Sequence, residues 1–102
     1  WIYVDDCAEQ FIRLALKAEN LSHLAYNSGG YSHSAEEIML LVKAWVPDAE
    51  YDFDESIPRT SLVDDTDGSR LEQEIAFTPR ATHEALQFHI NEARFGAGLS
   101  LI

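Results

Sequence analysis

The chain has 102 residues and a mass near 11.5 kDa, which is a common size for one domain and too short for two ordinary ones. Hydrophobic residues make up 46% of it, enough to supply a core. Eighteen acidic against seven basic side chains give a formal net charge of −11, so the chain should repel a phosphate backbone. Composition therefore indicates one folded domain, residues 1–102, and argues against a nucleic-acid-binding protein.

The sequence carries a single cysteine, Cys7, which excludes an intrachain disulfide and a four-thiolate zinc site and favours a reducing, cytoplasmic compartment. No apolar run approaches the roughly 20 residues that a membrane-spanning helix needs. No basic and apolar leader precedes the first periodic segment. We therefore expect a soluble cytoplasmic protein without a membrane partner. Because Trp1 already lies in a β-favouring run, we also expect the chain to start inside an element, as a fragment would.

The first segment predicts a short strand followed by a helix. The run Trp1–Val4 is rich in β-branched and aromatic residues, and a 3.6-residue period follows from Cys7 to Glu19. Asp6 is the expected N-cap, with Glu9 at the third helical position as in a capping box. Apolar residues recur on one face of this helix, namely Ala8, Phe11, Ile12, Ala15 and Leu16.

A second strand and a second helix are predicted next. Leu24–Asn27 is a short β-favouring run that ends at the glycine turn Ser28–Gly30. Ser34 and Glu37 have the spacing of a capping box, and Pro47 ends the helix that follows. The apolar positions of this helix are Ile38, Leu41, Val42 and Trp45.

The middle of the chain is its acidic part. Apolar and acidic residues alternate over residues 49–54, the period-2 pattern of a half-buried edge strand, with Tyr51 and Phe53 expected to pack against the Trp45 helix. Ten acidic and two basic residues lie between Asp48 and Glu74. Their spacing is not that of an EF-hand loop, so we interpret the run as a solvated face, with a cation site or a basic partner as the alternatives.

Two further helices are predicted after an irregular loop at residues 56–60. The first starts near residues 67–69 with Leu71 and Ile75 on one face, and Thr78–Arg80 breaks the chain after it. Thr82 is the expected cap of the last helix, which stops near Gly96. The predicted fold is therefore α/β, with three short strands and four helices. Its core should come from residues 14–16, 38–45 and 86–90.

Four segments of the chain carry a family resemblance, namely Trp1–Ala8, Tyr26–Gly30, Ser34–Ile38, and Asp67–Leu71 with Ile75–Arg80. In this order they resemble the C-terminal part of the extended short-chain dehydrogenases/reductases, the NAD-dependent epimerase/dehydratase family. They are similar to the family's aromatic-x-x-Val-x-Asp-x-Ala junction, its Tyr-Asn-x-Gly-Gly strand end, the helix start after it, and its Asp-x-Ser-Lys/Arg…Leu-Gly-Trp/Phe-x-Pro signature. Ala76 departs from the family at a usual glycine, and the Arg-x-Gly-Asp-like loop is reduced to Pro58-Arg59-Thr60.

The resemblance implies the substrate-binding portion of a larger enzyme. In an intact member the first two strands would join a parallel dinucleotide-binding sheet, NAD(P) would be the cofactor, and a nucleotide sugar the substrate. The loops after Asn27 and Phe53, with Arg59, would close over that substrate. We therefore expect Arg59 and Asn27 to be substrate-binding residues. For Arg59, an ion pair with Asp54 or Glu55 is an equally weighted alternative.

The residues that carry the family's chemistry are missing. No GxxGxxG turn occurs, and none of the four tyrosines is followed four residues later by lysine. The histidines have no metal-ligand spacing, Asp5 and Asp6 are better explained as capping residues, and Cys7 as a buried, inert thiol. We therefore expect no catalytic, cofactor or metal site in this chain alone.

Two hypotheses about function and partners follow. Either the chain is the substrate-binding part of an NAD(P)-dependent epimerase/dehydratase-like enzyme, or it is a stand-alone relic that serves as a binding or oligomerisation module. Without the dinucleotide-binding sheet, strand edges and helix faces would stay uncovered. The expected partner is therefore a second copy, forming a dimer, or the missing Rossmann half.

Overall fold

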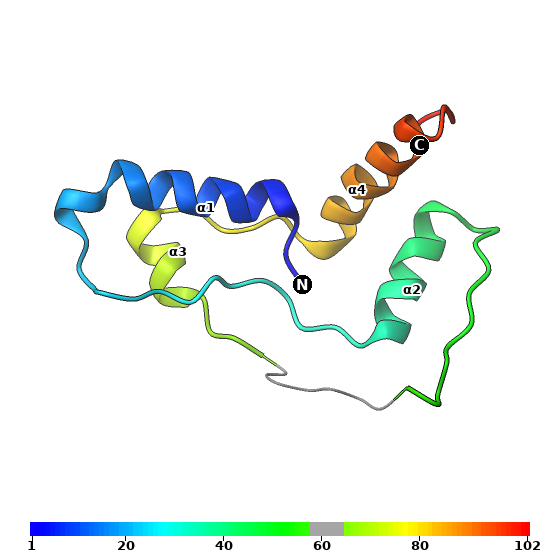
Figure 1. Cartoon of the computed structure of the whole chain (residues 1–102), viewed down its shortest axis with the longest axis horizontal. Helices are drawn as coiled ribbons and strands as arrows, with labels where there is room; N and C mark the ends of the chain where they lie inside the picture. The colour runs from blue at the N-terminus through cyan, green and yellow to red at the C-terminus, as the bar shows by residue number, and fades with distance from the viewer. Residues whose placement is uncertain (58–64) are drawn as a thin grey trace.

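The computed structural model describes residues 1–57 and 65–102, and across these two ranges the chain is helical, with no strand (Figure 1). Long extended segments connect the helices. The elements are α1 (Val4–Leu16), the short 3₁₀ helix η1 (Ala18–Asn20), α2 (Ala35–Trp45), α3 (Ser69–Ile75) and α4 (Thr82–Gly96).

The predicted α/β fold with three strands is wrong. Residues 24–27 and 49–53 are extended but unpaired, and the run that begins at Trp1 turns into α1 at Val4. Trp1 and Tyr31 exchange two backbone hydrogen bonds, from the Tyr31 N–H to the Trp1 carbonyl over 2.9 Å and from the Trp1 amino group to the Tyr31 carbonyl over 2.7 Å. Tyr31 lies beyond the predicted strand at residues 24–27, and these bonds do not extend into a ladder. β-Branched and aromatic residues favour a strand only where a neighbouring strand supplies hydrogen bonds, and the described part of the chain supplies none.

The four predicted helices are present, and the α2 start is as expected. The Ser34 hydroxyl accepts a hydrogen bond from the Glu37 backbone N–H over 3.2 Å, and the Glu37 carboxylate accepts one from the Ser34 N–H over 2.7 Å. This reciprocal capping box satisfies two N–H groups that the first helical turn leaves without partners.

Two predicted caps are wrong. Tyr3, and not Asp6, is the N-cap of α1, so Asp6 lies within the first turn. Ala81 is the N-cap of α4, and the hydroxyl of Thr82 instead lies 2.7 Å from the Nε2 atom of His33. In both cases the side chain binds a residue far away in the sequence instead of capping its own helix. The helices therefore begin through backbone geometry, aided in α1 by acidic residues near the positive helix end.

The buried residues lie where α1 packs on α3 and where the chain enters α4. The predicted core is confirmed at Leu86 but not elsewhere, because Leu14 is only half-buried, Leu16 is exposed, and no residue of α2 is fully buried. Three buried residues are polar. The buried hydrophobic residues are Tyr3, Leu71, Ile75, Ala85 and Leu86, and the buried polar ones are Asp6, Gln10 and Thr82.

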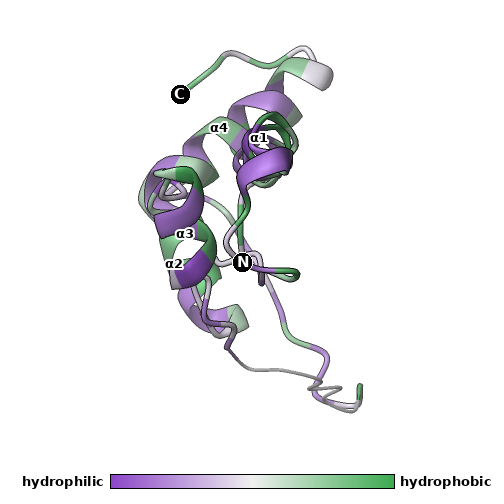
Figure 2. Cartoon of the chain, turned by 90° about the vertical axis from the view of Figure 1, so that its left-hand side faces the viewer, coloured by the Kyte–Doolittle hydropathy of each residue, from purple (hydrophilic) through white to green (hydrophobic). Residues whose placement is uncertain are grey.

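The molecule is a thin plate measuring 49 × 35 × 18 Å, and its narrow edge is seen in Figure 2. Its radius of gyration is 16.5 Å, whereas a compact domain of this length has a value of about 13 Å. A helix with its side chains is about 10–12 Å across, so the plate is less than two helices deep. Since domains are usually built from two or more packed layers, most elements here have one side uncovered. Within the described residues, no helix has the length and apolar content to cross a membrane.

Candidate functional site

Asp6 and Arg80 join the start of α1 to the segment that enters α4. The first turn of α1 carries Asp6, whose side chain is 2% exposed, and the break before α4 carries Arg80. The Nε and terminal nitrogens of Arg80 both lie 2.8 Å from one Asp6 oxygen, and the Arg80 backbone N–H donates to the other oxygen over 2.8 Å. Both hydrogen bonds are charge-assisted.

Aromatic rings enclose this ion pair. The Arg80 guanidinium carbon lies 5.0 Å from the centre of the Tyr3 ring and 4.7 Å from that of Phe88. Burial, together with the hydrogen bond from the Tyr3 hydroxyl to Glu92, raises the pKa of Tyr3 to about 12. A tyrosine that acts as a general base needs the opposite shift, so Tyr3 stays protonated and serves as a packing residue.

A second polar cluster ties the extended segment after η1 to α3. Glu74, whose side chain is 6% exposed, accepts from the Tyr26 hydroxyl over 3.0 Å and from the Ser22 N–H over 3.3 Å, and its other oxygen lies 3.1 Å from Lys17 Nζ. Burial opposes ionisation, but the hydrogen bonds from Lys17, Tyr26 and Ser22 outweigh it and lower the pKa of Glu74 to about 2. The hydrogen bonds from Ser22 and Tyr26 to this carboxylate hold the extended segment against α3.

Two glycines cross where the Tyr26–Gly30 segment passes the start of α3. A β-carbon on Gly68 would lie 2.3 Å from the Cα of Gly29, and one on Gly29 would lie 3.0 Å from the Cα of Gly68. The glycines therefore allow two backbones to touch.

A surface groove of about 320 Å³ opens beside this crossing and is the strongest candidate for ligand binding. It combines an indole, backbone amides, hydroxyls and a carboxylate, the groups that bind polyhydroxylated ligands through stacking and hydrogen bonds. On one wall the Ser32 hydroxyl donates to Asp65 over 3.0 Å. The lining residues are Trp1, Ile2, Ser28, Gly29, Gly30, Tyr31, Ser32, Asp65 and Thr66.

Of the two predicted substrate-binding residues, only Asn27 lies in the described part of the chain. Asn27 is exposed on the extended segment and directly precedes the lining residue Ser28. Arg59 lies outside the described residues, so neither its ligand role nor its alternative ion pair is tested. Sequence reasoning missed Asp65 and Thr66, because they follow an irregular loop and carry no motif.

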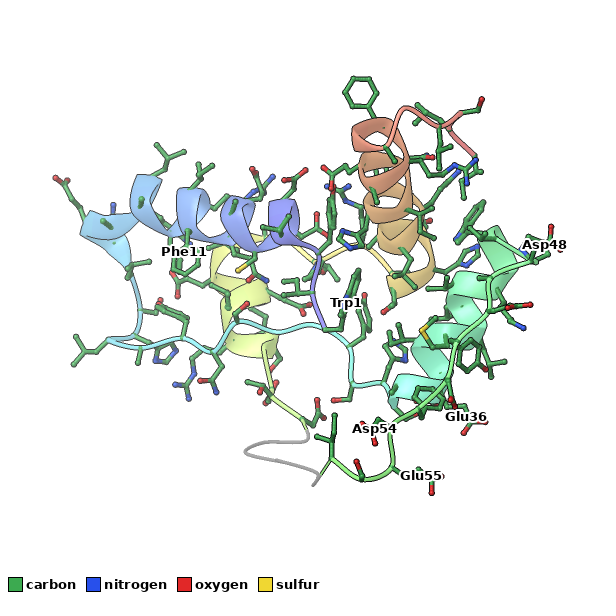
Figure 3. All side chains as sticks on the ribbon, turned by 45° about the vertical axis from the view of Figure 1, so that its right-hand side comes forward. Trp1, Phe11, Glu36, Asp48, Asp54 and Glu55 are labelled. Atoms are coloured by element: carbon green, nitrogen blue, oxygen red, sulfur yellow. The ribbon has the colours of Figure 1, made fainter. Side chains whose placement is uncertain are left out.

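A second groove, of about 500 Å³, lies between the start of α2 and residues 53–57. Glu36, Asp54 and Glu55 surround it (Figure 3) and disfavour an anionic ligand. The prediction that Tyr51 and Phe53 pack against the Trp45 helix is confirmed for Tyr51, whose ring centre lies 5.5 Å from the Nζ atom of Lys43 in α2. The Trp45 indole stacks on His83 at 4.4 Å, while Tyr51 lies against Phe53, with ring centres 5.2 Å apart, and against Lys43.

The remaining candidate ligands occupy structural positions. Cys7 is half-buried, His33 contacts Thr82, and the His83 carbonyl accepts from the Trp45 indole over 2.9 Å. In the ranges that the structure describes, no three His, Cys, Asp or Glu side chains are grouped closely enough to hold a metal ion.

No protein-family model matches the sequence, and no curated protein or solved structure is significantly similar to the chain.

Proposed function

We propose that this chain is the substrate-binding part of an NAD(P)-dependent, nucleotide-sugar epimerase/dehydratase-like enzyme and that it does not catalyse a reaction on its own. NAD(P) would be bound by a dinucleotide-binding part outside this chain and would supply the hydride chemistry there. A cytoplasmic location, where the lone thiol stays reduced, is part of the same proposal.

The observation that carries the proposal is that three of the four resembling segments contact one another. Asp6 of the first segment binds Arg80 of the last, and Gly29 of the second crosses Gly68 of the last. Ala76, which stands where the family has glycine, adopts a φ of +49°, a conformation that glycine accommodates best.

The groove beside Asn27 supports a sugar as the bound moiety. Its hydroxyl and amide groups match the donors and acceptors of a pyranose, and Trp1, 42% exposed, offers an aromatic face. Its volume of about 320 Å³ is at the small end of ligand sites, which suits one sugar ring.

The test is a ¹H–¹⁵N NMR titration of the chain with UDP-glucose as the nucleotide-sugar probe. We expect saturable shifts of the Asn27 to Ser32 amides at millimolar ligand, weakened several-fold by Asn27→Ala and by Arg59→Ala. The matched controls are Asn20→Ala and Arg70→Ala, since both residues are exposed and neither lines the groove. Shifts that do not saturate, or that both test substitutions leave unchanged, would contradict the proposal.

The second candidate function is a stand-alone oligomerisation module, and one observation favours it. The apolar face of α1 is turned toward solvent, with Phe11 68% and Leu16 85% exposed. Tight self-association without any response to UDP-glucose would favour this alternative.

A further inference from the structure

Helix α1 packs with its polar side inward. Asp6 and Gln10 are 1% and 2% exposed and face the rest of the chain, with Arg13 half-buried beside them. On the opposite side of the helix, an apolar stripe faces solvent. Figure 1 shows that α1 runs along an outer edge of the plate. The exposed residues of the stripe are Val4, Ala8, Phe11, Ile12, Ala15 and Leu16.

This orientation is set by specific contacts. Asp6 is held by Arg80, and the amide oxygen of Gln10 accepts from the Ser28 hydroxyl over 2.7 Å. Arg13 forms an ion pair with Glu9 over 2.6 Å, and its guanidinium lies 4.9 Å from the Phe77 ring centre. Turning the helix to bury its stripe would break the contacts of Asp6, Gln10 and Arg13 with Arg80, Ser28 and Phe77, whereas the Arg13–Glu9 pair lies within α1 and would turn with it. The stripe can therefore be covered only from outside.

The chain exposes more surface than a compact protein of its mass. Its accessible surface is 7730 Å², whereas a compact protein of this mass exposes about 5,800 Å². The difference comprises polar and apolar surface of the whole chain. The exposed apolar side chains of α1 are part of it, and contiguous exposed apolar residues mark interaction surfaces.

The order of residues in the stripe fits a second copy of the same helix. Val4, Ala8, Phe11 and Ala15 follow a spacing of four, three and four residues, as in a coiled-coil seam. In an antiparallel pair centred between Glu9 and Gln10, Val4 faces Ala15 of the other copy and Ala8 faces Phe11. The two large side chains of the seam, Val4 and Phe11, then each meet an alanine, so these four seam positions are self-complementary about a twofold axis.

We propose that two copies of this chain form a dimer through the outward faces of α1, packed antiparallel in this register. The macrodipoles of the two helices oppose each other, which is favourable. The acidic residues do not oppose the pairing, because most of the net charge lies between Asp48 and Glu74, outside α1. The proposal is independent of the sugar-binding function.

The first test is sedimentation equilibrium of the whole chain at tens of micromolar, where we expect a dimer. Ala8→Glu and Phe11→Asp should each produce a monomer, because each places a charge in the seam. Ala8→Glu keeps a good helix former at an exposed position, so far-UV circular dichroism should be unchanged. The matched control is Leu24→Asp, since Leu24 is fully exposed on another segment and its variant should remain dimeric.

The second test is disulfide cross-linking, which checks the register. In a Cys7→Ser background, the double variant Val4→Cys with Ala15→Cys should oxidise to a covalent dimer. Ala15→Cys alone should not, because its two copies would lie about 16 Å apart along the helix axis. A monomeric parent chain, a dimer that survives both seam substitutions, or equal cross-linking by Ala15→Cys alone would overturn the proposal.

Discussion

At the scale of single residues, the Asp6 carboxylate holds the start of α1 against the segment before α4 by binding Arg80. Replacing it by Asn keeps its shape but removes the charge that Arg80 binds. We expect Asp6→Asn to lower the free energy of unfolding by about 1–3 kcal/mol, measured by urea titration. The neighbouring Asp5 is exposed, so Asp5→Asn should change the free energy of unfolding by no more than about 0.5 kcal/mol. Equal effects of the two substitutions would show that the ion pair does not organise the fold.

Glu74 makes a pH-dependent contribution with a defined sign. Its pKa falls from 4.5 in the unfolded chain to about 2 in the folded one, so its stabilising effect is complete above pH 4.5 and is lost as the pH falls toward 2. We expect the urea midpoint of the parent chain to fall across this window more steeply than that of Glu74→Gln. Carboxyl ¹³C NMR of Glu74 measures the pKa directly. If the urea midpoints of the two chains fell equally with pH, or if Glu74 had an ordinary pKa, Glu74 would not be held by Lys17 and Tyr26 as described.

Asp6 also shows what residue patterns alone can and cannot predict. Its position before an amphipathic run predicts a cap, and in α2 the same reasoning correctly places Ser34 and Glu37. In α1 the partner, Arg80, lies 74 residues away, and local spacing holds no information about it. The groove residues Asp65 and Thr66 were missed for the same reason.

At the scale of elements, the contact between residues 26–30 and α3 requires two glycines. We expect Gly68→Ala to destabilise the chain by about 1–3 kcal/mol, because the new β-carbon would overlap the Gly29 backbone. Gly96→Ala is the matched control, since no atom lies within 4 Å of the added carbon there and alanine is the better helix former. If Gly68→Ala were as well tolerated as Gly96→Ala in thermal unfolding, the two segments would not cross as described.

The end of α3 offers a substitution in the opposite direction. Ala76 ends this helix with a φ of +49°, which costs a residue with a β-carbon about 1–2 kcal/mol. Ala76→Gly should therefore stabilise the chain, by about 1 kcal/mol once the greater flexibility of glycine in the unfolded state is counted. Ala97, at the end of α4, has a φ of −90°, so Ala97→Gly should give no such gain. A loss of stability in Ala76→Gly would contradict the left-handed helix end.

The contrast between helices and strands follows from where their hydrogen bonds go. A helix satisfies its backbone within one segment, so the 3.6-residue period predicted the four α-helices of the described ranges to within a few residues, although two of the predicted caps are wrong. A strand needs a partner from elsewhere, and residues 24–27 and 49–53 have the pattern without the partner. The direction in which α1 faces was also unpredictable, because periodicity identifies an apolar stripe but not what covers it.

At the scale of the whole molecule, the plate-like shape is held together mainly by polar contacts. Asp6, Gln10 and Glu74 hold polar sides of elements together, while apolar residues of α1 face outward. Such a chain gains little from burial by itself and needs a second layer. The proposed dimer would supply one layer for α1, and the proposed enzyme would supply more.

The most direct measurement is small-angle X-ray scattering of the Ala8→Glu variant in dilute solution, where the seam is blocked and each chain stands alone. The account predicts an extended, flat particle with a radius of gyration close to the 16.5 Å of the structure. A value near 13 Å, as in compact domains of this length, would contradict it. It would mean that the chain closes around its own apolar residues and that the outward face of α1 is buried inside.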